Sequence, residues 1–210
     1  GKGMSSGSIL RLGVMAAMLF AGPALADTID PEEVPQTFAE GFIQGVGVPV
    51  ISVYHLAAMI GVGILVGIAA RGAVPVLAFG AAAILGVAYQ LSPYELPADE
   101  AFVALTTMII GLLILLRKPI SPRVASGLFA VAGLVHGYSL GAVVAHASAV
   151  PVLAYATGLL IVQTAIGLAA CAITLGATKW PARRAALLLA GGLVVVAGGL
   201  AAIEAAGLIG

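Results

Sequence analysis

The chain has 210 residues, of which 61% are hydrophobic and 9% are charged, and its mean hydropathy is +1.17. Ordinary soluble domains carry about a quarter charged residues, so this composition excludes a water-soluble fold. The single cysteine, Cys171, excludes a disulfide framework within one chain, and the sequence shows no basic groove for nucleic acid.

The first 26 residues have the parts of a secretory signal peptide. A short basic region precedes an apolar stretch from Leu12 to Phe20, and Ala24-Leu25-Ala26 forms an A-x-A cleavage site. We therefore expect residues 1–26 to be cleaved, so that the mature chain begins at Asp27. Residues 27–43 are acidic and contain two prolines, and we interpret them as a short segment on the periplasmic side.

Residues 44–210 consist of apolar stretches separated by short breaks with proline, glycine or charge. A bilayer core of about 30 Å needs about 20 apolar residues per helix. On this rule the sequence predicts an all-α, polytopic membrane helix bundle. Its six transmembrane helices are expected at residues 44–70, 73–92, 99–117, 123–146, 151–177 and 182–207.

Charged residues are sorted between alternate loops. If Asp27 lies outside, strict alternation places three loops in the cytoplasm, and these loops hold every basic residue after the signal peptide: Arg71, Arg117, Lys118, Arg123, Lys179, Arg183 and Arg184. All nine acidic residues lie on or near the opposite side. The positive-inside rule therefore predicts a multi-pass protein of the bacterial inner membrane, with the lipid bilayer as its partner and both termini in the periplasm.

Motifs of soluble enzymes are missing from the sequence. There is no P-loop, dinucleotide fingerprint, paired cysteine or nucleophile elbow, and no nucleophile, base and orienting group occur together. We expect no enzymatic activity, no catalytic residue and no nucleic-acid partner.

Polar residues inside a membrane span are costly, so each one is a functional hypothesis. His55 lies in the first predicted helix and His136 in the fourth, at similar depth, and Glu100 opens the third from the same side. We expect the two imidazoles to face each other inside the bundle and Glu100 to converge with them. The alternatives are a structural role for the histidines, a helix-start role for Glu100, and simple interhelical hydrogen bonding for Gln163 and Thr164.

Four stretches of the sequence resemble the HupE/UreJ family. They are Gly47-Val48-Pro49-Val50-Ile51-Ser52-Val53-Tyr54-His55-Leu56-Ala57-Ala58-Met59-Ile60-Gly61-Val62-Gly63, Glu100 to Gly111, Leu134-Val135-His136-Gly137-Tyr138-Ser139-Leu140-Gly141, and Tyr155-Ala156-Thr157-Gly158. Members of that family are small membrane proteins encoded with hydrogenases or ureases and regarded as nickel or cobalt permeases. The similarity spans roughly residues 41 to 176.

The resemblance implies a metal site with a reduced ligand set. Three positions of this chain differ from the family pattern. This chain has Val48 where the family has a histidine before proline, and it has Tyr54 where the family has an aspartate. It has Leu140 where the family has the second histidine of the fourth helix. His55 and His136 remain, with Glu100 as the third candidate ligand. Nickel(II) and cobalt(II) favour imidazole and carboxylate, so the loss of three ligands weakens such a site.

Three functions remain open at this point. The first is a permease or metal-binding accessory protein for Ni²⁺ or Co²⁺, with His55 and His136 as ligands and Glu100 as the entry carboxylate. The second is a structural or assembly subunit that docks on other membrane subunits or on further copies of itself and transports nothing. The third is a haem protein with His55 and His136 as axial ligands.

Overall fold

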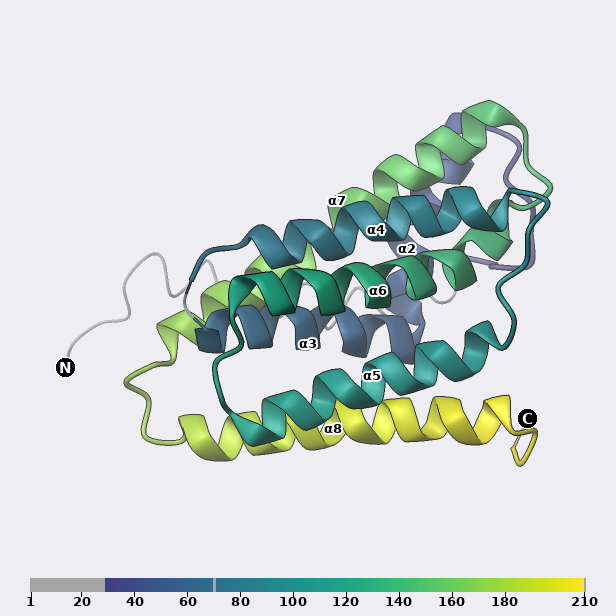
Figure 1. The fold of residues 1–210 in the computed structure, drawn as a ribbon. Helices are drawn as coiled ribbons and strands as arrows, with labels where there is room; N and C mark the ends of the chain where they lie inside the picture. Colours follow the sequence, from purple (N-terminus) through teal and green to yellow (C-terminus); the bar gives the residue numbers. More distant parts are fainter. Residues whose placement is uncertain (1–28, 70, 210) are drawn as a thin grey trace.

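A computed structural model describes residues 29–69 and 71–209, so the predicted signal peptide lies outside the described residues (Figure 1). Regular secondary structure in the described part of the chain is entirely helical. In chain order the helices are α2 (Phe38–Ile51), α3 (Val53–Ala69), α4 (Val74–Gln90), α5 (Asp99–Leu116), α6 (Pro122–Leu140), the 3₁₀ turn η1 (Gly141–Val144), α7 (Ala149–Gly176) and α8 (Arg183–Ala205).

Four of these helices are long and apolar enough to cross a membrane on their own. They are α5, α6 continued by η1, α7 and α8, and the bent pair of α2 and α3 adds a fifth candidate span. Helix α4 has 17 residues instead of the 20 expected: it begins at Val74, with Pro75 in its first turn, and ends at Gln90, before Ser92-Pro93. A polytopic all-α membrane bundle is thus confirmed, although length and composition identify four or five spans among the described helices and not six.

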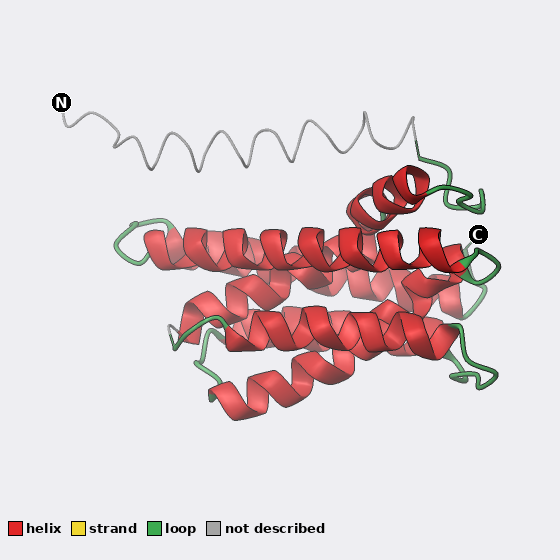
Figure 2. Cartoon of the chain, turned by 90° about the horizontal axis from the view of Figure 1, so that it is seen from above, coloured by secondary structure: helices red, strands yellow, loops and turns green. Residues whose placement is uncertain are grey.

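The single helix predicted for residues 44–70 is wrong, because the chain bends by 81° between α2 and α3. Pro49 lies inside α2 and removes a backbone donor from its last turn, and Ser52 then adopts an extended conformation with φ −85° and ψ 112°. The helical hydrogen bonds resume with the Leu56 amide donating to the Ser52 carbonyl. Figure 2 shows the consequence: the short α2 lies at a steep angle to the other helices.

The remaining helices run back and forth along the bundle, so that alternate loops lie at the same end (Figure 1). The α3–α4, α5–α6 and α7–α8 loops share one end, and these are the loops that hold the basic residues. The α4–α5 and α6–α7 loops lie at the other end, together with the C-terminus. The fold therefore has the separation of charge that the sequence predicted.

Glycine allows α4 and α6 to pack backbone against backbone. A Cβ atom at Gly133 would collide with the Phe79 carbonyl, one at Gly137 with the Ala83 backbone, and one at Gly86 with the Leu134 carbonyl. Such close approach provides the van der Waals contact that holds helices together where no hydrophobic effect acts between them. It also fixes the rotation of α6, and with it the direction of the His136 side chain.

Candidate functional site

His55 and His136 meet in the interior of the bundle. Their Nδ1 atoms are 2.8 Å apart, which is a hydrogen bond between the two rings. The ring centroids are 4.9 Å apart and the ring planes make an angle of 77°. The exposed fraction is 7% for His55 and 0% for His136. The prediction that these two imidazoles face each other inside the bundle is confirmed.

The bend between α2 and α3 positions the first of these histidines. His55 is the third residue of α3, directly after the break at Ser52. It therefore lies in the first turn of its own helix and not inside one continuous helix from residue 44, as the sequence predicted. His136 lies in the last turns of α6. Both imidazoles are therefore nearer to the end of the bundle with the α4–α5 and α6–α7 loops than to the end with the basic loops.

The far side of the His136 ring contacts α5. Its Nε2 atom is 3.2 Å from the hydroxyl oxygen of Thr106 and 3.4 Å from that of Thr107. Both threonines are buried. Phe79 of α4 covers the same ring, with the centroids 6.1 Å apart. His136 is thus fixed by contacts on both of its nitrogens and on its face.

Two tyrosines hold the end of α6 that carries His136. The Tyr155 hydroxyl of α7 donates to the Leu140 carbonyl at 2.7 Å, and the backbone amide of Leu96 donates to the Tyr138 hydroxyl at 3.1 Å. The first bond connects two of the stretches that resemble the HupE/UreJ family. These motif residues therefore secure the position of the histidine and do not themselves reach it.

Glu100 does not join the two histidines in this structure. It lies in the first turn of α5, where a carboxylate favours the positive end of the helix dipole, and its side chain is exposed. Among the described residues, no group of three His, Cys, Asp or Glu side chains comes together as a metal-binding set. The sequence could not reveal this, because it gives the depth of a residue but not the direction in which its side chain points.

Two of the three positions that depart from the family pattern lie together. Val48 and Leu140 belong to one buried apolar cluster, which also contains Tyr155 and Leu159. Leu140 is one helical turn beyond His136 on α6. Tyr54 points elsewhere, toward Glu204 at the end of α8. Apolar side chains thus occupy the two positions at which the resemblance implies histidine.

Gln163 of α7 is the other buried polar group that stands out. Its side chain is 2% exposed, and neither its amide nitrogen nor its amide oxygen has a hydrogen-bond partner among the described residues. The alternative that Gln163 serves only as an interhelical hydrogen-bonding residue therefore has no such bond among the described residues. The same helix approaches α3 one turn further on, where a Cβ atom at Gly63 would collide with the Gly167 carbonyl.

The geometry of the histidine pair does not fit a haem. An iron held between two axial imidazoles would separate the ligating nitrogens by about 4 Å, twice a metal–nitrogen bond of about 2 Å, and the macrocycle would lie between the rings. In this protein the two rings are in direct contact. The third sequence hypothesis therefore has no structural support.

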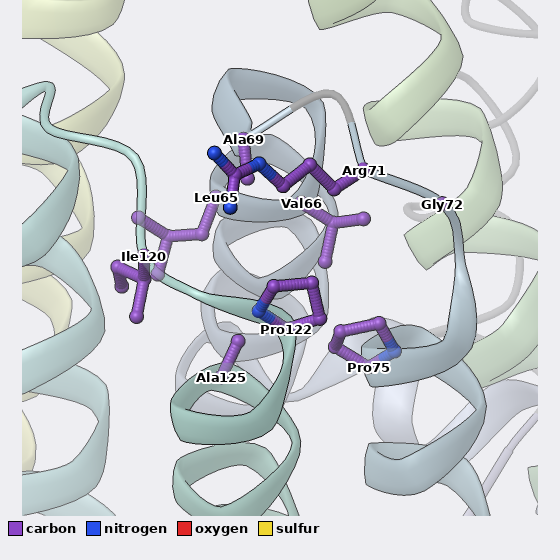
Figure 3. Close-up of a pocket in the computed structure, with 9 residues that line it drawn as sticks. All are labelled: Leu65, Val66, Ala69, Arg71, Gly72, Pro75, Ile120, Pro122 and Ala125. Carbon is purple, nitrogen blue, oxygen red and sulfur yellow. The ribbon is translucent and has the colours of Figure 1, made fainter.

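A shallow pocket lies at the opposite, basic end of the bundle (Figure 3). The Arg71 side chain reaches across it toward Leu65 and Ala69. Its lining residues are Leu65, Val66, Ala69, Arg71, Gly72, Pro75, Ile120, Pro122 and Ala125. This lining has no carboxylate, imidazole or thiol to ligate a metal, so the pocket is not a second metal site.

Comparisons with known proteins gave one result. The family model described as "HupE / UreJ protein" matches residues 15–201, which is most of the chain. Searches of curated proteins and of solved structures found no match.

Proposed function

The chain belongs to the HupE/UreJ family, and from this membership we propose that it is a membrane permease or accessory protein that binds a late first-row divalent ion such as Ni²⁺ or Co²⁺. The observation that carries the proposal is the buried contact between His55 and His136. Ionisable side chains at membrane depth are costly and are associated with function. Imidazole is a good ligand for nickel, and its affinity follows the order of the late divalent metals.

The reduced ligand set gives this site a low affinity. One or two imidazoles without a carboxylate hold an ion weakly, and a conduction path needs weak sites because the ion must also leave. The sequence has no ATP-binding motif, so the driving force is an ion gradient or the membrane potential.

Metal analysis of the purified protein tests this proposal. We expect the wild-type chain to retain Ni²⁺ or Co²⁺ after equilibrium dialysis. His55→Ala should retain at least about ten-fold less metal, because the substitution removes an imidazole ligand. His146→Ala is the matched control, since that histidine is exposed in the α6–α7 loop and should leave binding unchanged. Thermal unfolding of each variant establishes that it is folded.

A wild-type chain that retains no metal would contradict the proposal. It would favour the second candidate, a structural or assembly subunit of a larger membrane complex. The observation in favour of that candidate is the absence of a third ligand beside the two histidines among the described residues.

The orientation in the membrane is a further part of the proposal. We propose that the protein lies in the inner membrane with both termini in the periplasm and the basic loops in the cytoplasm, because lysine and arginine near helix ends stay on the cytoplasmic side. An alkaline phosphatase fusion after Gly210 should be active, and one after Lys179 inactive. A green fluorescent protein fused after Gly210 that fluoresces brightly would contradict this topology.

A further inference from the structure

The hydroxyl groups of Thr106 and Thr107 each donate their hydrogen to a backbone carbonyl of α5. The Thr106 hydroxyl lies 2.8 Å from the Phe102 carbonyl, and the Thr107 hydroxyl lies 2.7 Å from the Val103 carbonyl. A carbonyl oxygen can only accept, so each of these short oxygen–oxygen contacts requires the hydroxyl hydrogen. Toward His136 both threonine oxygens can therefore act only as acceptors.

The proton positions on both imidazoles follow from this. His136 Nε2 faces the two hydroxyl oxygens, so it must carry the hydrogen. In a neutral imidazole the other nitrogen is then an acceptor, so Nδ1 of His136 accepts a hydrogen bond. Its partner at 2.8 Å is Nδ1 of His55, which must donate. The Nε2 atom of His55 is thereby left with a lone pair, and the hydrogen bond that the described residues give to the His55 ring is the one at Nδ1.

We infer that His55 alone binds the metal ion, through Nε2, and that His136 is a positioning residue whose tautomer is set by Thr106 and Thr107. This inference rests on the proposed function for the identity of the ligand, a late first-row divalent ion. The two Nδ1 atoms cannot both face one ion, because they share a proton. A ligating histidine normally donates its other ring N–H to a partner that fixes its tautomer, and here His136 is that partner.

The tautomers are measured directly by nitrogen-15 NMR of histidine-labelled protein in detergent micelles, without metal. The chain has 3 histidines, and His146→Gln leaves the two of interest. In each ring the unprotonated nitrogen resonates far downfield of the protonated one. We expect the hydrogen on Nε2 of His136 and on Nδ1 of His55. A hydrogen on Nδ1 of His136 would overturn the inference.

Substitution of the threonines tests what sets the tautomer. In the double variant Thr106→Val, Thr107→Val the hydroxyl acceptors are lost, so the single tautomer of His136 should be replaced by a mixture. Thr106→Ser, Thr107→Ser keeps both hydroxyls and should give the wild-type spectrum. Thr174→Val is the matched control, because that hydroxyl also donates to its own helix, at 2.8 Å to the Ala170 carbonyl, and lies outside the site. An unchanged spectrum in the double valine variant would overturn the role of the threonines.

Cobalt binding separates a ligand from a positioning residue. His55→Ala should lose the visible Co²⁺ spectrum altogether. His136→Gln can still accept from His55 and donate to a threonine, so it should keep the band positions, while the affinity falls by about 10–100-fold, as is usual for partners of ligands. A shift of the bands in His136→Gln would make His136 a ligand and overturn the inference. If the wild type binds no cobalt, the proposed function fails and the assignment of His55 as ligand fails with it, whereas the tautomer result tests the threonine–histidine chain independently.

Discussion

Replacing Val48 and Leu140 together by histidine is expected to raise the affinity for Ni²⁺ by at least about 100-fold, or about 2.7 kcal/mol of binding free energy. Both side chains belong to one buried cluster, and Leu140 lies one turn from His136. Two further imidazoles would thus be added to one cluster, next to the turn of α6 that carries His136. Adding Tyr54→Asp should contribute less, because Tyr54 lies beside Glu204 and not in that cluster.

Isothermal titration calorimetry of the wild type and the double variant measures this difference. Without metal the double variant should melt at a lower temperature, because imidazoles in an apolar cluster lack hydrogen-bond partners. Added Ni²⁺ should restore the melting temperature, since a ligand that binds only the folded state stabilises it. Val131→His adds an imidazole on an exposed face of α6 and is the control. Equal affinities in the double variant and this control would show that α2 and α6 do not present the two positions to a common point.

Gly137→Leu is expected to prevent α4 and α6 from packing and to cost more than about 3 kcal/mol of stability, at the upper end of the range for overpacked cores. A Cβ atom at this position would already meet the backbone of Ala83. Backbone atoms cannot rotate out of the way, so the helices must separate. The contact between His55 and His136 would be lost as α6 moves.

The matched control for this substitution lies on the same helix. A Cβ atom at Gly127 would have no neighbour within 4 Å, so Gly127→Leu should leave stability unchanged or raise it slightly. The melting temperature of both variants in the same detergent checks the prediction. Equal melting temperatures would mean that close packing at Gly137 does not hold the bundle together.

The sequence predicted the membrane bundle, and it predicted which loops share an end, because each residue has its own cost of transfer into lipid. Apolar runs must lie in the bilayer, and the loops with Arg71, Lys118 and Lys179 must lie on one side. Both requirements hold however the helices pack against each other. The same reasoning predicted that His55 and His136 face each other inside the bundle, since an imidazole in hydrocarbon has no hydrogen-bond partner.

The sequence contains a signal for the break in the first predicted helix. Pro49 lies near the start of the apolar run from residue 44 to residue 70, and proline inside a helix removes a hydrogen bond. Apolar composition continues on both sides of it, however, so a hydropathy rule counts one span. The size of the bend is a tertiary feature: it goes with close packing of α2 on α7, where a Cβ atom at Gly45 would collide with the Tyr155 carbonyl.

The sequence by itself therefore determined where the chain lies, which of its loops share a side, and which polar side chains need a partner, since these depend on the solvation of each residue alone. Only the tertiary structure decided that Glu100 stays exposed, that the Thr106 hydroxyl contacts the His136 ring, and that the Nδ1 atoms of the two histidines meet. The two histidines are 81 residues apart and the threonine is 30 residues from His136. Contacts at such separations depend on the rotation of each helix about its own axis, which the backbone contacts of glycines such as Gly137 set and no local pattern records.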